Sequence, residues 1–282
     1  MYNFVPRVPA ELADMVLDQL STDVDTLRKA STVCKAWLPR SRVHLFRKVC
    51  VTSDFDEFLE FLRSETQVQP YIRTLVLKGP DLYEIDEPQA PQTTLPPHTI
   101  ADIVALLPRL EVLQLQNVSL HDHKCDGMHA APAPLFPPRT LGALQLMNVG
   151  SLSDTTNDIF GVLGLFSEIH FLHLAAVAHI LHDPTAHAPQ LPDTPLPQLR
   201  VHALKLEDTH TDIYYKAIRA TDSKEVLRRI EVECSSDEHA TALAEFLEYA
   251  GGGLEHLALD FTHCFRPDED ADDGEEIILA GK

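Results

Sequence analysis

Residue types that carry out chemistry are present in this chain, but their spacing does not predict an active site. Cys34 is a candidate nucleophile, yet it falls in an apolar helical stripe with no neighbour in sequence that would lower its pKa. The sequence contains no G-x-S-x-G elbow, no glycine-rich phosphate loop and no H-E-x-x-H pair. We therefore interpret Cys34 as a buried structural residue, and we expect no catalytic residues and no enzyme activity.

One segment combines soft metal ligands within a short distance. His121, His123, Cys125 and His129 share one stretch of chain. Zinc sites usually have a wider ligand spacing on a rigid turn, whereas this stretch is rich in Pro and Ala. We expect no metal there, and a hydrolase that uses this stretch is the least favoured alternative.

The acidic segment 268–274 is similar in composition to a calcium-binding loop. Counted from Asp268, the sixth position is Asp273 where such a loop needs Gly, and the twelfth is Leu279 where it needs a bidentate Glu. The pattern fails at both positions, so we interpret residues 266–282 as a solvated acidic tail. Ile277, Ile278 and Leu279 are the one feature there that would suit a further strand. The sequence thus predicts neither a metal nor a cofactor.

The charge balance excludes some classes of partner. The 282 residues carry a formal net charge of −20, which argues against nucleic-acid binding because phosphate affinity comes from clustered Lys and Arg. No stretch approaches the roughly 20 apolar residues that span a membrane, and the start of the chain does not match a signal peptide. The five cysteines are scattered and odd in number, as in reduced proteins. We expect a cytoplasmic or nuclear protein, or both.

An internal repeat provides the main architectural signal. The pattern apolar-x-x-apolar-x-apolar recurs seven times, at intervals of 38, 31, 28, 32, 26 and 27 residues. Alternate side chains of a strand face opposite ways, so the fourth and sixth positions of each unit share one buried face, which stacked neighbours must cover. The seven units are 72–77, 110–115, 141–146, 169–174, 201–206, 227–232 and 254–259.

Helical periodicity appears between several units. Ser53 is placed as the N-cap of a helix that reaches about Leu62, and Ser236 as the N-cap of one that stops at the glycines from Gly251. Three further helices are expected at 99–107, 155–166 and 211–220.

These units resemble leucine-rich repeats over residues 70–265. The family expects Asn or Cys eight positions after the first Leu, whereas Asn117 and Asn148 lie at the seventh. The repeats are therefore irregular, and a continuous asparagine ladder is not expected. An ordinary α/β domain with a parallel sheet is the alternative interpretation.

Residues 5–50 form a separate helical pattern. Pro9 suits the first turn of a helix that we expect to run to about Leu20. The apolar side chains of this helix cover an arc of about 200°, twice the stripe of about 100° of a one-sided surface helix. The extra width requires a second burying surface, so it predicts a partner. A second helix is expected from near Asp25 to Pro39, and a short third one around 43–46.

The order and spacing of this segment are specific. In sequence they read Val8-Pro9-x-Glu11-Leu12, Val16-Leu17-x-x-Leu20, Leu27-Arg28 and Val33-Cys34-x-x-Trp37.

This pattern resembles the F-box. The resemblance implies a three-helix motif that docks on the Skp-type adaptor of a cullin-based ubiquitin ligase. The alternative is that these helices only cap the repeats. The residues that the resemblance places in the adaptor contact or its supporting core are Pro9, Leu12, Val16, Leu20, Leu27, Val33, Cys34 and Trp37.

The third, fifth and seventh positions of the repeats should face outward on the concave side of a curved parallel sheet. The side chains at the fifth positions change along the chain from apolar and amide types to charged types. One end of this row would therefore suit an apolar side chain of a partner, and the other end a basic group. The alternative is that the row is only the solvated face of the sheet. As candidate substrate-binding residues we select Val76, Gln114, Gln145, Phe171, His173, Lys205 and Glu231.

The predicted class is α/β, with an F-box at 1–50, a leucine-rich-repeat-like solenoid at 51–265 and the acidic tail at 266–282. The F-box resemblance implies a non-catalytic substrate-recognition subunit of a Skp–cullin–F-box E3 ubiquitin ligase, which binds the adaptor, through it a cullin, and an unknown substrate protein. The alternative is a repeat scaffold for protein–protein interaction with no ligase role.

Overall fold

The structure is a computed structural model that describes residues 9–80, 93–120, 139–151, 157–179, 198–207, 211–234 and 236–261. The predicted acidic tail and the stretch 121–129 with its His and Cys residues lie outside these ranges. The helices are α1 (Ala10–Gln19), α2 (Val24–Val33), α3 (Leu38–Leu45), α4 (Phe55–Ser64), α5 (Pro97–Leu106), α6 (Asn157–Leu163), α7 (Thr211–Arg219) and α8 (Asp237–Ala250), with 3-10 turns η1 (Gln69–Tyr71) and η3 (Asp222–Glu225).

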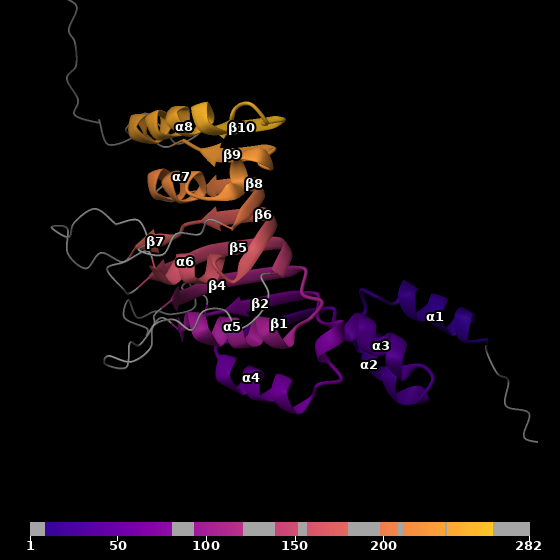
Figure 1. Cartoon of the computed structure of the whole chain (residues 1–282). Coiled ribbons are helices and arrows are strands. Elements are labelled where there is room, and N and C mark those ends of the chain that lie inside the picture. The colour runs from indigo at the N-terminus through magenta and orange to yellow at the C-terminus, as the bar shows by residue number, and fades with distance from the viewer. Residues whose placement is uncertain are drawn as a thin grey trace, which may run out of the picture.

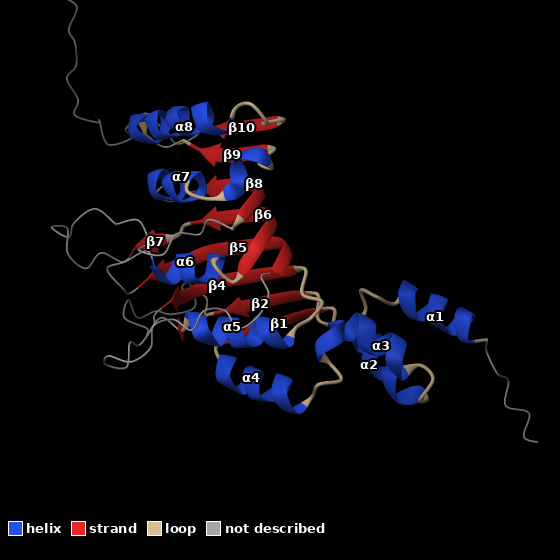
Figure 2. Ribbon diagram, in the orientation of Figure 1, coloured by secondary structure: helices blue, strands red, loops and turns tan. Residues whose placement is uncertain are grey.

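The described strands form one sheet in which every pair is parallel (Figures 1 and 2). Eight strands follow one another in chain order, while the two-residue strands β3 and β7 pair beside β4 and β5. The strands are β1 (Lys48–Thr52), β2 (Thr74–Lys78), β3 (Thr94–Leu95), β4 (Val112–Leu120), β5 (Arg139–Ser151), β6 (Phe166–Ala175), β7 (Ala178–His179), β8 (Arg200–Glu207), β9 (Arg229–Glu233) and β10 (His256–Asp260).

The seven predicted repeat strands correspond to β2, β4, β5, β6, β8, β9 and β10, so the α/β class and the parallel sheet are confirmed. β1 was not predicted, although Phe46, Val49 and Val51 have the apolar spacing of the repeat, because residues 43–46 were assigned to a short helix. It extends the sheet by pairing with β2 and crosses the predicted boundary at residue 50.

Helices α4 to α8 stack along one face of the sheet in chain order (Figure 1). The core lies between these two layers, and the fourth and sixth repeat positions, such as Leu113 and Leu115, are buried there in every predicted strand except β10. Neighbouring repeats therefore cover each other, as the stacking argument requires.

One expected helix start and one expected helix end differ from the structure. Ser53 is not the N-cap of α4; Asp54 is, and Ser53 has a φ of 71°. The second expected helix does not reach Pro39, because α2 ends at Val33 and the next residue is extended. Pro39 instead lies in the first turn of α3, where its missing N–H leaves no helical bond unmade. The N-cap at Ser236 is confirmed, since its side chain accepts a hydrogen bond from the amide of His239.

The expectation that the asparagines form no continuous ladder agrees with the described repeats, although two of the asparagines pair with each other. Asn117 and Asn148 both have a φ near 50°, and Nδ2 of Asn148 donates to Oδ1 of Asn117 over 2.9 Å. The next repeat has Ala176 at the same position, with a φ of 48°. Asn tolerates this left-handed backbone better than most residues. The asparagines of two repeats therefore pair with each other, one position earlier in the repeat than the family pattern places its Asn.

Ala176 is the residue in this series whose side chain least suits a left-handed backbone. We predict that Ala176→Gly raises the free energy of unfolding by about 0.5–1 kcal/mol, because the relief of a left-handed strain of about 1–2 kcal/mol exceeds the entropy cost of Gly. Urea denaturation measures the change. Ala203→Gly is the matched control in a regular strand and should destabilise the protein; equal destabilisation by both variants would contradict this explanation.

Candidate docking surfaces

The N-terminal helices have a small core of their own. Leu17 from α1 and Leu27 and Ala30 from α2 are buried together, and Trp37 packs against them. Phe46, which follows α3, packs instead against the main core. Figure 1 shows this helical unit projecting from the β1 end of the sheet. α3 therefore connects a distinct unit to the repeats.

A charged clamp holds α1 against α3. Nε and Nη2 of Arg40 each donate to a carboxylate oxygen of Asp18 over 2.6 Å, and Nε2 of His44 lies 2.8 Å from Oδ1. These hydrogen bonds lower the pKa of Asp18 from 3.8 to about 2, and the bond from Arg40 has the largest effect. A bidentate Arg–carboxylate pair fixes geometry as well as charge, so the clamp sets how α1 lies on α3.

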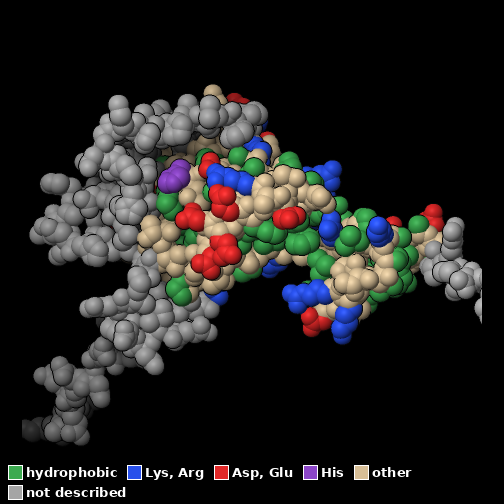
Figure 3. Space-filling view, turned by 90° about the horizontal axis from the view of Figure 1, so that it is seen from below, with side chains coloured by type: hydrophobic (Ala, Val, Ile, Leu, Met, Phe, Trp, Pro, Cys, Tyr) green, Lys and Arg blue, Asp and Glu red, His purple; other side chains and the backbone are tan. Residues whose placement is uncertain are grey.

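The outer side of α1 remains apolar and exposed. Leu12, Met15 and Val16 are 52%, 64% and 51% exposed, and Val33 at the end of α2 is 63% exposed. Figure 3 shows hydrophobic side chains next to Lys and Arg on the N-terminal helices. The wide apolar arc of α1 thus has an inner part that builds the small core and an outer part that no described residue covers.

The residues expected at the adaptor contact divide into three groups. Pro9, Leu12, Val16, Val33 and Cys34 are exposed, Leu20 and Trp37 are half-buried, and Leu27 is fully buried.

Cys34 requires a correction. We expected a buried residue in a helical stripe, but Cys34 is exposed. The reason is that α2 ends one residue earlier, and the extended backbone of Cys34 turns its side chain out of the stripe. Met15, by contrast, belongs to the exposed surface although it matches no motif position; the width of the apolar arc was the signal that indicated it.

The second surface is the sheet face opposite the helices. Strand pairing places Val76 beside Gln114, and continues in register through every fifth position to Ala258. The register of this row is therefore as predicted. Phe171 lies two residues before His173 on the same face of β6, and the two rings are 6.1 Å apart. Val76 is buried, whereas the row from Gln114 to Glu231 is half-buried.

The middle of this face is built from amides. Nε2 of Gln114 donates to Oε1 of Gln145 over 2.7 Å, and Nε2 of Gln116 lies 3.7 Å from the sulfur of Met147. These groups have spare donors and acceptors, which suits contact with a polypeptide backbone.

The C-terminal half of the face is charged. Glu207 lies 2.8 Å from Nε2 of His173 and 2.6 Å from Nζ of Lys205. Burial by itself would raise the pKa of Glu207, but the hydrogen bonds from Lys205 and His173 outweigh it and hold the pKa below its usual value. Within β9, Glu231 pairs with Arg229. This half can bind a charged partner through ion pairs and hydrogen bonds.

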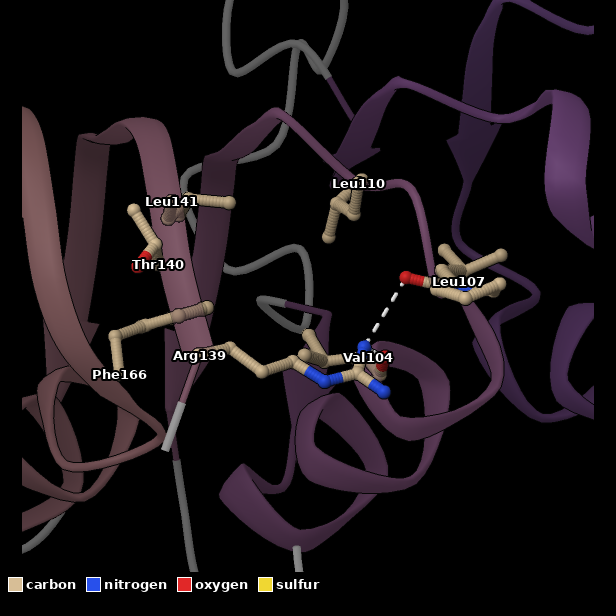
Figure 4. Close-up of a pocket in the computed structure, with 8 residues that line it drawn as sticks. Val104, Leu107, Leu110, Arg139, Thr140, Leu141 and Phe166 are labelled. Carbon is tan, nitrogen blue, oxygen red and sulfur yellow. Dashed lines mark hydrogen bonds between the residues drawn. The ribbon is translucent and has the colours of Figure 1, made fainter. Parts of the chain in front are cut away.

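The sheet also has a hollow at the start of β5, and the polar contacts inside it stabilise the fold. It has a volume of about 260 Å³ and is lined by Val104, Leu107, Leu141 and Phe166 among others (Figure 4). The guanidinium of Arg139 lies in it and donates to the carbonyls of Ala105 and Leu107, both over 3.1 Å, at the end of α5. Arg139 thus caps that helix.

Comparisons with family models, with curated proteins and with solved structures returned no match. Among the described helices, none is long and apolar enough to cross a membrane. Within the same residues, no three His, Cys, Asp or Glu side chains gather as a metal site would require. The two surfaces described above are therefore the features on which a function can be argued.

The clamp at Asp18 leads to a pH prediction. Because the folded-state pKa is lowered, the carboxylate stabilises the helical unit above pH 3.8, and this contribution is lost as the pH falls towards about 2. Trp37 is the single Trp, so its fluorescence reports on unfolding of the helical unit in urea. Asp18→Asn should therefore lower the urea concentration at the midpoint of this transition at pH 7 and have little effect near pH 2. Glu11→Gln, in the first turn of α1, is the control. An equal loss at both pH values would refute the clamp.

Proposed function

We propose that this chain is the substrate-recognition subunit of a Skp–cullin–F-box E3 ubiquitin ligase. In this proposal, the N-terminal helical unit binds a Skp-type adaptor and the open face of the sheet binds a target protein. The observation that supports it most is the exposed apolar side of α1, at the positions where the F-box resemblance places the adaptor contact.

The energetics of that surface favour a partner. Fully burying a side chain of the size of Leu, Val or Met contributes about 1.5–3 kcal/mol relative to leaving it in water. Leu12, Met15, Val16 and Val33 are each at least half exposed on one small unit. An adaptor that covers them gains this free energy, and the clamp between Asp18 and Arg40 has already fixed the orientation of α1, which lowers the cost of ordering.

The arrangement of the two surfaces suits a receptor. The helical unit projects from one end of the sheet (Figure 1), and strand pairing places the amide and charged row along the sheet face. An adaptor on the unit leaves that face available to a substrate. The substrate would then be held near a ubiquitin-charged enzyme bound to the cullin, which makes the transfer effectively intramolecular.

The first prediction concerns the adaptor surface. We expect the double variant Leu12→Ala, Val16→Ala to weaken binding of a purified Skp-type adaptor by about 2–4 kcal/mol, or about 30- to 1000-fold, because both side chains lie at the centre of the proposed contact. Isothermal titration calorimetry measures the affinity.

The free protein should tolerate these changes, since substitutions of exposed side chains rarely alter stability by more than about 0.5 kcal/mol. Phe61→Ala is the matched control, because Phe61 is also an exposed apolar residue, 38% exposed, but lies on α4. It should bind the adaptor like wild type. A folded wild-type chain that does not bind the adaptor would overturn the proposal.

The sheet face gives a second prediction. Phe171→Ala with His173→Ala should reduce recovery of substrate proteins by an adaptor-bound chain, because it removes an aromatic anchor and a polar group at the centre of the face. Quantitative mass spectrometry compares this variant with Glu245→Ala, a control on the exposed side of α8. Unchanged recovery of every bound protein would leave this face as a merely solvated surface.

A repeat scaffold with no ligase role is the second candidate, and one observation favours it. Phe46 packs against the main core, and Nη1 of Arg42 donates to Gln67 over 3.2 Å, so the helical unit also covers the β1 end of the sheet. A chain that binds no adaptor yet unfolds cooperatively only with residues 9–46 present would support this function instead.

A further inference from the structure

The C-terminal end of the sheet is open within the described residues. Leu257 and Leu259 of β10 are in register with Ile230 and Val232 of β9, which are 0% and 3% exposed. Their own side chains are 41% and 39% exposed, and Phe261 is 40% exposed. The same repeat positions are thus buried in strands with described neighbours on both sides, and about two-fifths exposed in β10, which pairs only with β9 among the described strands.

The backbone of β10 is equally one-sided. The amide of His256 donates to Arg228 and the carbonyl of Asp260 accepts from Cys234, so residues 256 and 260 direct their backbone groups towards β9. Alternate residues of a strand bond to opposite sides. The N–H and C=O groups of Leu257 and Leu259 therefore point to the outer edge, which is the kind of edge that templates pairing with another chain.

We propose that the outer edge of β10 pairs antiparallel with β10 of a second copy of this chain. A two-fold axis at Ala258 places Leu257 of one copy opposite Leu259 of the other, so the outward backbone groups of both residues form hydrogen bonds. The same axis places His256 opposite Asp260 at both ends of the contact. The strand is thus complementary to itself in hydrogen bonding, in apolar side chains and in the pairing of an imidazole with a carboxylate, as an isologous interface requires.

Helix α8 also suits this contact. Its α7 side is occupied, because the ring of Phe246 stacks on Tyr215 at 4.6 Å and the hydroxyl of Tyr249 donates to the carbonyl of Thr221. By helical geometry the opposite flank contains Ala240 and Leu247. A two-fold axis perpendicular to the sheet keeps both helical layers on the same face, so this flank of one copy faces the same flank of the other.

The test is the oligomeric state of the full chain by sedimentation velocity over a range of concentrations. We expect a monomer–dimer equilibrium. His256→Asp places two carboxylates opposite each other at both ends and should weaken the dimer about tenfold or more. The double variant His256→Asp, Asp260→His exchanges the partners and should restore it. A chain that stays monomeric at every concentration overturns the proposal.

A proline variant tests the edge itself. Leu259→Pro removes an amide that points outward and leaves the bonds to β9 intact, as edge strands allow, so it should abolish the dimer without unfolding the chain. A dimer that survives this change has its interface elsewhere. Hydrogen exchange at the amides of Leu257 and Leu259 tests whether the chain covers this edge itself. If these amides are protected equally at every protein concentration, residues of the same chain cover the edge. Either result overturns the proposal, and neither bears on adaptor binding.

Discussion

The structure depends on contact between neighbouring repeats, because no repeat can bury its leucines alone. Leu113 is covered by β2 and β5 and by the helical layer, and each further strand repeats the arrangement. In such a stack every internal surface is satisfied by its neighbours, so the unsatisfied surfaces lie at the two ends and on the helix-free face of the sheet. These are the places where the molecule can interact with others, and the two ends of the sheet differ in what covers them.

At the N-terminal end the chain adds three helices with a small core around Leu17 and Leu27. That core uses only the inner part of the apolar arc of α1, and the clamp between Asp18 and Arg40 then holds the outer part towards water. At the C-terminal end of the described sheet, Leu257 and Leu259 of β10 are 41% and 39% exposed. We propose an adaptor as the partner of the first surface and a second copy of the chain as the partner of the second.

The repeat strands and their register could be predicted from the sequence because each contains the same leucine spacing, and register follows from the buried face. β1 has the same spacing at Phe46, Val49 and Val51, but it was not predicted because residues 43–46 also fit a short helix. Another reason explains why the sequence did not predict the end of α2 at Val33 or the left-handed turns at Asn117 and Ala176. They depend on tertiary contacts and on single backbone angles, which a periodic pattern does not encode. Among the candidate adaptor residues, the pattern could not separate exposed Leu12 from buried Leu27.

The central claim is that the exposed side of α1 is an adaptor-docking surface, and the methionines allow it to be tested in the unmodified chain. Met15 lies on that surface, 64% exposed, while Met147 lies on the helix-free face of β5. In a sample with labelled methionine methyl groups, the NMR signal of Met15 should shift or broaden when a Skp-type adaptor is added, and that of Met147 should stay unchanged. A Met15 signal that does not respond to an excess of adaptor would contradict the account.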